Sequence, residues 1–307
     1  MPLNTLEYAQ ILQTKLDQKM VEASTSGWME ANAGQVIYNG GREVKVPVMD
    51  LTGLKDYDRD DGYPKGSVTL SYQTLTMGMD RGTSFQLDSM DVNESNFIAS
   101  ATTVSGEFQR TQVVPEVDAY RYSKIAAMAE KTGRTCDVDE KNVYSELVDD
   151  IATVRDLVGE TEPLVCCISA RVKAKLEKMA DFHRLVDVAD FTQGNICTKV
   201  KTVNGVPLLP VPSARMKTSY VFADGKTEGE ENGGFKAGTE AKDINWIIMP
   251  KKAPIAISRQ DKMKIIDPQT YQKADAWFIG YRKYHEVWVL KNQLGNIVPN
   301  IAGSKGV

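Results

Sequence analysis

The chain opens with a short stretch of helical periodicity. Within residues 4–23, Leu12, Leu16 and Met20 fall at helical spacing, and the turn-forming letters STSG at 24–27 follow directly. The turn separates this helix from the rest of the chain, and its narrow apolar stripe needs a partner surface from elsewhere. We therefore expect an N-terminal arm rather than a helix of the core.

Residues 35–77 change to an extended pattern that predicts a long β-ribbon. Apolar and polar residues alternate in two runs, at Val44, Val46 and Val48 and then at Val68, Leu70 and Tyr72. The letters NGG at 39–41 predict a turn, and the charged stretch LTGLKDYDRDDGYPKGS between the runs predicts a solvated tip. Arms of about ten residues reach roughly 30 Å at about 3.3 Å per residue, and such a ribbon is only marginally stable alone. We expect it to lie on another surface, such as a neighbouring subunit.

The middle of the chain mixes helices and strands, which predicts an α+β fold. Helical spacing covers 95–112, 116–133, 143–159 and 170–179, with Pro115 between the first two helices, and a buried strand covers 163–170. The alternation after Gly133 predicts a compact α/β lobe.

Extended chain returns near the C-terminal end. A Gly-rich segment at 222–243 contains almost no apolar residues and predicts a long surface loop. Strand patterns follow at 244–250, 254–258, 263–266 and 281–290. The last of these is apolar on both faces, so we expect it inside a sheet.

Composition narrows the class of protein. Of the 307 residues, 42% are hydrophobic and 25% charged, as in ordinary globular proteins, and the length suits about two domains of roughly 150 residues. The net charge of −4 argues against a dedicated nucleic-acid binder, which needs clustered Lys and Arg. No apolar run approaches membrane-spanning length, and the first twenty residues lack the pattern of a signal peptide. We expect the chain to be made in a reducing cytosol.

No catalytic or metal-binding motif is complete. The four cysteines form no C-x-x-C pair, and Cys166 and Cys167 lie in an apolar strand where burial should make them inert. The sequence contains only two histidines, His183 and His285, so it offers few groups for acid–base catalysis or metal binding. We expect each histidine to be a packed or surface residue. The sequence predicts no cofactor, and we expect the protein not to be an enzyme.

Two further motifs fail on spacing. The acidic run from Asp56 starts like a calcium loop, but Gly62 comes one place too late and Ser67 replaces the required Glu. Residues 225–227 match the end of a phosphate-binding loop. That motif needs another glycine five residues earlier, and position 220 is Tyr. Isopeptide bonds between ribbon lysines and a C-terminal asparagine are possible but not favoured over solvated lysines; the residues are Lys45, Lys55, Lys65, Asn292, Asn296 and Asn300.

The features that remain point to self-assembly. A detached arm and an unsupported ribbon are surfaces that one subunit cannot bury, and they are stabilised when neighbouring copies cover them. Head-to-tail contacts of this kind close into rings. Composition and spacing therefore predict a self-assembling structural protein.

The order of the segments also resembles the major capsid proteins of tailed bacteriophages, whose fold is shared with encapsulin shells and the herpesvirus capsid floor. GGREVKVP, GLKDYDRDDGYPKG and VTLSYQTLTMGMDRGTSFQLDSMDVNES resemble their extended loop and the strand that leaves it, and PEVDAYRYSKIA resembles their spine helix. The segments GVPLLPVPSARM at 205–216, INWIIMPKKAPIAISR at 244–259 and DAWFIGYRKYHEVWVL at 275–290 resemble later strands of the axial and peripheral domains. The resemblance covers most of residues 35–290.

The resemblance implies a division of the chain and an assembly mechanism. Residues 1–34 would form the N-terminal arm, 35–78 the extended loop, 79–135 with 244–307 the peripheral domain, and 136–243 the axial domain. Axial domains would meet in pentamers and hexamers, while each arm and loop lies over adjacent subunits. A procapsid would close around scaffold and portal and expand as double-stranded DNA enters.

The resemblance, which is to proteins of phages and prophages, also implies where this chain acts and what it binds. We expect assembly in the host bacterial cytoplasm, a final place in the capsid of the virion, and DNA contact without sequence specificity. No long helical prodomain precedes the arm, so we expect either a separate scaffolding protein or a trimmed form of the chain, and the initiator Met favours the former. Ionic contacts between subunits are expected at the loop tip and where the loop leaves its domain, at Asp56, Asp58, Arg59, Asp61, Asp80 and Arg81.

Two alternatives to a phage capsid remain. An encapsulin-type bacterial nanocompartment shell would share the fold, although its usual loop is shorter and differently placed. An enzyme with an unrecognised site in the α/β lobe would need a cluster of titratable groups that the spacing does not show.

Overall fold

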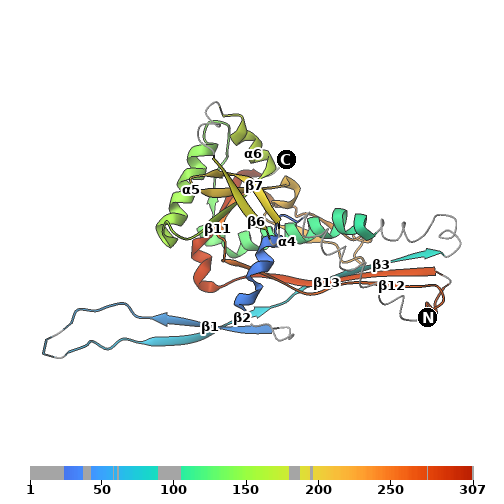
Figure 1. Ribbon diagram of the computed structural model, residues 1–307, viewed down its shortest axis with the longest axis horizontal. Helices are drawn as coiled ribbons and strands as arrows, with labels where there is room; N and C mark the ends of the chain where they lie inside the picture. Colours follow the sequence, from blue (N-terminus) through green and yellow to red (C-terminus); the bar gives the residue numbers. More distant parts are fainter. Residues whose placement is uncertain are drawn as a thin grey trace.

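The computed structural model describes residues 24–36, 43–57, 59–60, 62–88, 105–179, 187–193, 196–274 and 276–305. The predicted arm helix at 4–23, the predicted turn at 39–41 and the start of the helix predicted at 95–112 lie outside these residues. Figure 1 shows three parts: an α/β lobe at the top, a long sheet at the lower right, and a ribbon that projects to the lower left.

A seven-stranded sheet forms the lobe, in the order β4-β14-β11-β5-β8-β7-β6. Its strands are β4 (Arg134–Thr135), β5 (Leu164–Ser169), β6 (Asp187–Gln193), β7 (Ile196–Val203), β8 (Val206–Val211), β11 (Lys242–Pro250) and β14 (Val298–Lys305). The pairs β5–β8 and β14–β4 are parallel and the others are antiparallel.

Helices cover both faces of this sheet. One face, with Cys166 and Ile168 of β5, packs on α5 (Val143–Val158) and α6 (Ala170–Glu177). The other face, with Val165 and Cys167, packs on α4 (Val114–Met128). A strand buried on both sides has a continuous apolar run, which explains why β5 is apolar at every position from 164 to 168.

The long sheet has three antiparallel strands, β12 (Pro254–Ile266), β13 (Ala276–Val289) and β3 (Met79–Asp88), with β13 in the centre. The prediction that the strand at 281–290 lies inside a sheet is confirmed. The two strands predicted at 254–258 and 263–266 are one strand, whose register shifts at a bulge between Ser258 and Gln260.

The spine helix is continuous where the sequence predicted a break. Helical residues run from 105 to 108, pass through a π-helical turn at Gln109–Val113 and continue as α4. Pro115 lacks an N–H and its ring crowds the preceding turn, and the wider π-helical turn directly before α4 accommodates both effects without ending the helix.

The ribbon consists of β1 (Glu43–Leu51) and β2 (Val68–Thr76), paired antiparallel from Glu43↔Thr76 to Leu51↔Val68. This confirms the predicted ribbon. Within the part of the chain that the structure describes, its strands pair only with each other, so it extends from the body as a separate two-stranded sheet (Figure 1).

Several elements were not predicted from the sequence. Strands β6, β7 and β14 were missed, and the loop predicted at 222–243 closes a short hairpin of β9 (Tyr220–Phe222) and β10 (Phe235–Ala237). Short 3-10 helices lie at Gly27–Gln35, Glu130–Thr132, Ser213–Arg215 and Lys291–Asn296. The predicted domain boundary between 243 and 244 falls inside β11, and residues 244–307 contribute strands to both the seven-stranded and the long sheet.

Candidate assembly surface

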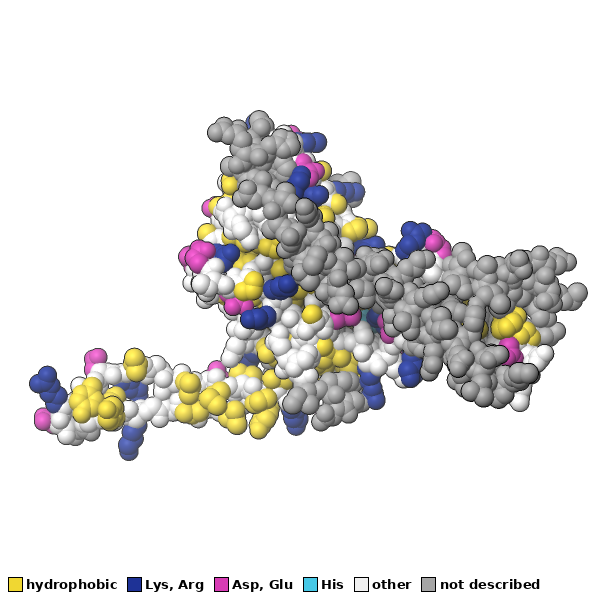
Figure 2. Space-filling model, in the orientation of Figure 1, with side chains coloured by type: hydrophobic (Ala, Val, Ile, Leu, Met, Phe, Trp, Pro, Cys, Tyr) yellow, Lys and Arg dark blue, Asp and Glu magenta, His cyan; other side chains and the backbone are white. Residues whose placement is uncertain are grey.

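The ribbon exposes one apolar face. Cross-strand pairing places Met49 opposite Leu70, and Leu51 opposite Val68, on one face together with Tyr72. Each of these five side chains is 53–67% exposed. Figure 2 shows hydrophobic side chains along the projecting ribbon.

This concentration is unusual within the described residues. They contain ten exposed large hydrophobic side chains, of which eight lie on the ribbon and its tip, the others being Leu157 and Val221. Scattered single apolar residues are normal on a protein surface, but a contiguous apolar face marks an interaction site. The ribbon therefore carries the candidate functional surface of this protein.

The opposite face of the ribbon is attached to its own subunit near the root. Leu75, with Val44 and Val46, packs against a cluster that includes Ile255 and Trp288 of the long sheet. The ribbon thus has one face turned to its own subunit and one face without a partner among the described residues.

Three alternate residues of β13 fix the root of the ribbon. Beyond the last pair of the β13–β3 ladder, His285↔Met79, the strands separate, and side chains take over the hydrogen bonding. Tyr284 donates from its hydroxyl to the carbonyl of Met77 at 3.0 Å, and Trp288 donates from its indole to the carbonyl of Thr76 at 3.1 Å. Between them, Glu286 accepts from the backbone N–H of Gly78 at 3.0 Å.

Glu286 also ties the root to the spine helix. Its side chain is 1% exposed, and Oε1 accepts from the hydroxyl of Tyr120 at 2.6 Å and from Nζ of Lys124 at 2.7 Å. Burial and the adjacent Glu286 carboxylate raise the pKa of Tyr120, which keeps its hydroxyl a donor. One buried carboxylate therefore joins the ribbon root, β13 and α4.

Arg81 attaches the 222–234 hairpin to the same helix. Its guanidinium makes a two-point contact with Glu116 of α4, at 2.8 and 3.3 Å. It also donates to the carbonyls of Ala223 at 2.6 Å and Gly234 at 3.2 Å. The planar guanidinium suits such a junction because its donors point in fixed directions.

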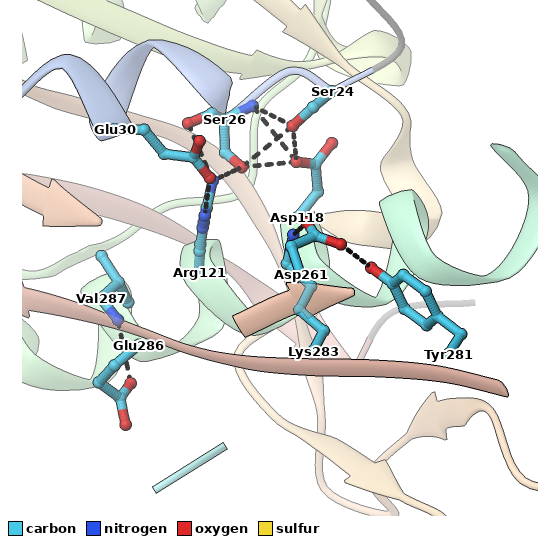
Figure 3. Close-up of polar contacts among 10 residues, drawn as sticks. All are labelled: Ser24, Ser26, Glu30, Asp118, Arg121, Asp261, Tyr281, Lys283, Glu286 and Val287. Carbon is cyan, nitrogen blue, oxygen red and sulfur yellow. Dashed lines mark hydrogen bonds and ion pairs between the residues drawn. The ribbon is translucent and has the colours of Figure 1, made fainter. Parts of the chain in front are cut away.

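A second buried carboxylate, Asp118, holds residues 24–26, which lie within the predicted arm and directly after its predicted helix. Asp118 is fully buried and accepts from the hydroxyls of Ser24 and Ser26 at 2.8 and 2.6 Å and from the backbone N–H of Thr25 at 3.0 Å. Arg215 of the lobe donates to it at 2.9 Å. Figure 3 shows Ser24 and Ser26 converging on this carboxylate, which fixes the direction of the chain at that point.

Ion pairs also join α4 to the 3-10 helix Gly27–Gln35, and β12 to β13 within the long sheet. Arg121 is 1% exposed and pairs with Glu30 at 2.5 Å (Figure 3). Burial alone would raise the pKa of Glu30, but the Arg121 guanidinium beside it holds that pKa below its usual value. Lys283 pairs with Asp261 at 2.6 Å, and the Tyr281 hydroxyl donates to the same carboxylate at 2.7 Å.

The predicted contact residues fall in two separate places. Asp56 and Arg59 lie exposed at the ribbon tip, and Asp58 and Asp61 lie outside the described residues. Asp80 and Arg81 lie on β3, where the sequence expected the loop to leave its domain. Asp80 pairs with Arg282 at 2.6 Å, and the hydrogen bond from Arg282 lowers the pKa of Asp80.

Of the histidines and strand cysteines considered in the sequence, His285, Cys166 and Cys167 are buried. His285 is 1% exposed on β13, and desolvation, followed by the surrounding cations, lowers its pKa well below the usual value. Burial raises the pKa of Cys167 to about 12, as expected for an inert thiol. His183 lies outside the described residues. Among the described residues, no three His, Cys, Asp or Glu side chains are placed to hold a metal, and no helix is long and apolar enough to cross a membrane.

Sequence reasoning missed Glu286 and Asp118. Both carried a usable pattern, because Glu286 interrupts an apolar strand and Asp118 shares a helical stripe with Tyr122 and Ile125. A lone carboxylate on an apolar face must be paired when it is buried. The sequence could therefore have identified the two carboxylates, although not their partners.

Comparison with known proteins supports one fold. No protein-family model matches the chain, and no curated protein is similar to it in sequence. Among solved structures, the capsid of the cyanophage P-SCSP1u is 11% identical, with a TM-score of 0.59, over 88% of this chain and 86% of that chain. The mature capsid of bacteriophage PhiM1 is 12% identical, with a TM-score of 0.57, over 88% and 85%. A virus-like particle from Pyrococcus furiosus is 10% identical, with a TM-score of 0.53, over 96% and 99%.

The chain therefore has the α+β fold of the tailed-phage major capsid proteins. The similarity to each of the two phage capsids covers 88% of this chain. The fold that the sequence resemblance implied is confirmed.

Proposed function

We propose that this protein is a phage major capsid protein, which assembles through pentamers and hexamers into an icosahedral shell around double-stranded DNA. The observation that carries the proposal is the outward apolar face of the ribbon, on a fold shared with phage capsids. A monomer would leave this face in water, whereas contact with an adjacent copy buries it. The role is structural rather than enzymatic.

In this proposal, each part of the fold corresponds to a domain of the phage major capsid proteins. Residues 1–34 serve as the arm and 35–78 as the extended loop. The seven-stranded lobe is the axial domain. Residues 136–243 form most of it, and strands β11 and β14 from the C-terminal segment complete its sheet. The long sheet and spine helix form the peripheral domain, built from 79–135 and the remainder of 244–307.

The charged residues divide between two roles in this account. Asp56, Asp58, Arg59 and Asp61 at the loop tip make ionic contacts with the adjacent subunit. Asp80 and Arg81 hold the loop's exit strand through Arg282 and Glu116, and the exposed Asp80–Arg282 pair adds a contact between subunits. Exposed pairs contribute about 0 to 1 kcal/mol each, so repetition around a ring supplies their effect.

The partners follow from shell assembly. Portal and scaffolding proteins direct closure in the host cytoplasm, and the finished shell is the capsid of the virion. Packaged DNA meets the shell through its phosphates alone, without sequence readout.

Sedimentation velocity of the purified chain, with negative-stain electron microscopy of every peak, tests the proposal. Megadalton shells or rings of five and six subunits are expected. A monomer or dimer that persists when a scaffolding protein is supplied would overturn the proposal.

An encapsulin-type shell is the second candidate. The match to the Pyrococcus furiosus virus-like particle, over 96% of this chain and 99% of that one, supports keeping it, because that particle is not described as a phage capsid. Nuclease treatment of native particles separates the two candidates. Protected DNA of a defined length supports a phage head, and particles that contain protein but no DNA support a compartment.

A further inference from the structure

A buried lysine contacts a carboxylate between two strands of the long sheet. Nζ of Lys283 on β13 lies 2.6 Å from Oδ2 of Asp261 on β12, and the two residues are cross-strand partners. The side chain of Lys283 is 3% exposed and that of Asp261 is 19% exposed. Figure 3 shows these two side chains with Tyr281 beside them. Strand pairing therefore holds the two groups together, largely out of water.

The burial of its lysine distinguishes this ion pair. In the other lysine–carboxylate pairs of the described residues, the lysine side chain is 19–70% exposed. Taking two ions out of water is costly, and their mutual attraction offsets the cost only when the geometry is excellent. A reaction that removes both charges and leaves a neutral group is therefore favoured at Lys283 and Asp261 more than at an exposed pair.

The two oxygens of the Asp261 carboxylate have different donors. Oδ2 accepts from Lys283, whereas Oδ1 accepts from the Tyr281 hydroxyl at 2.7 Å. Tyr281 is 5% exposed and forms an apolar cluster with Val113 and Val117 of the spine helix. A donor held on Oδ1 in such surroundings stabilises negative charge that develops on that oxygen. This arrangement suits amide formation, in which one carboxyl oxygen stays and the other leaves.

The reacting atoms are close enough for attack. The carboxyl carbon of Asp261 is one bond away from Oδ2, so Nζ of Lys283 lies near the separation of about 3–3.5 Å at which reacting atoms are poised. Well-oriented groups in one molecule react as if at a concentration of about 10⁵–10⁸ M. A condensation that is slow between free groups in water can therefore proceed between two groups that a folded protein holds in contact.

We propose that Lys283 and Asp261 form an isopeptide bond within each subunit. The ammonium first gives one proton to Oδ2, which produces an amine and a carboxylic acid. The amine nitrogen then attacks the carboxyl carbon, the bond from that carbon to Oδ2 breaks, and Oδ2 leaves as water with a second proton from the nitrogen. Oδ1, held by Tyr281, becomes the amide oxygen. The reaction consumes no oxidant, cofactor or second protein.

The bond joins the edge strand β12 to the central strand β13. It lies close to the bulge between Ser258 and Gln260, where the register of the two strands shifts. The reaction removes the charge of Lys283, and desolvation with the three other cations still lowers the pKa of His285. Both reacting groups belong to one chain, so the inference goes beyond the proposed function and does not depend on assembly.

Intact-mass spectrometry of the purified full-length chain tests the bond directly. We expect a mass lower by one water molecule than the sequence requires, and a branched peptide that joins residues 261 and 283 after digestion. Lys217 and Asp243 lie 2.7 Å apart but are more exposed, so they are the internal control and should stay unlinked. A chain of full mass that yields no branched peptide would overturn the proposal.

Substitutions separate the bond from the ion pair. Lys283→Arg keeps the positive charge but has no amine to attack, so this variant should have its full mass. Asp261→Asn should form the same bond with loss of ammonia and reach the mass of the linked parent chain. Tyr281→Phe should form the bond about a hundredfold more slowly after refolding, because it lacks the donor to Oδ1. Loss of water from Lys283→Arg as well would contradict the assignment.

Discussion

At the scale of single residues, a few buried carboxylates determine how the parts of this subunit are joined. Asp118 and Glu286 are each almost fully buried, and each accepts hydrogen bonds from two or more segments. Removing a charge from water is costly, and only complete hydrogen bonding offsets the cost. Such sites specify one arrangement of arm, helix and ribbon, because any other arrangement leaves a buried charge unpaired.

Substitution of Glu286 tests this joining role. Glu286→Gln keeps the shape but removes the charge that Lys124 faces, and we expect the free energy of unfolding of the unassembled subunit to fall by about 1–3 kcal/mol in urea titrations. The control is Glu140→Gln, since the Glu140–Lys178 pair is exposed and should contribute less than about 1 kcal/mol. Equal effects of the two substitutions would contradict the role of Glu286.

The buried histidine makes stability depend on pH. Desolvation, aided by Arg121, Lys283, Lys124 and Arg81, holds the pKa of His285 well below its usual value near 6.5 in the folded state. As the pH falls below about 6.5 the unfolded chain binds a proton that the folded chain does not, so stability decreases by up to about 1.4 kcal/mol per pH unit. Unfolding measured from pH 7 to 5 should show this slope, and His285→Gln should reduce it. An unchanged slope in that variant would show that other groups cause the dependence.

At the scale of elements, alternation in the sequence predicted the ribbon, but its function depends on which face is free. Odd residues of β1 and even residues of β2 share the outward face, and this follows from register, which only the structure supplies. The sequence pattern did not predict some other elements correctly, for physical reasons. The spine helix contains Pro115, whose usual effect is cancelled by a π-helical turn, and β14 carries Pro, Gly and Asn that a strand pattern disfavours.

The outward face should matter for assembly and not for folding. Leu70→Ser removes an exposed apolar contact, so we expect impaired shell formation with nearly unchanged thermal melting of the monomer. Leu157→Ser on α5 is a control of similar exposure and should leave both unchanged. Sedimentation and calorimetry report the two properties, and a lower melting temperature for Leu70→Ser would assign the residue to the subunit's own fold.

Charge reversal at the tip tests the predicted ionic contacts. Arg59→Glu should impair closure of the shell and leave the melt of the monomer nearly unchanged, because Arg59 is exposed at the ribbon tip. The control is Arg110→Glu on the spine helix, where Arg110 forms an exposed ion pair with Glu107. Equal damage by Arg59→Glu to melting would show that Arg59 serves the fold of its own subunit.

At the scale of the whole molecule, one copy of the chain leaves an apolar surface of the ribbon exposed to solvent. The lobe and long sheet bury large apolar clusters, whereas the ribbon keeps its outward face in solvent. The segment order in the sequence was enough to predict the fold. The two sheets share residues 244–307, so the boundary between the lobes depends on strand pairing between distant segments, which a sequence pattern does not contain.

A cryo-electron microscopy reconstruction of the assembled particle is the most direct test. We predict that Met49, Leu51, Val68, Leu70 and Tyr72 of each ribbon are covered by an adjacent subunit in rings of five and six. A shell in which this face remains exposed to solvent, or particles held together without the ribbon, would contradict the central claim.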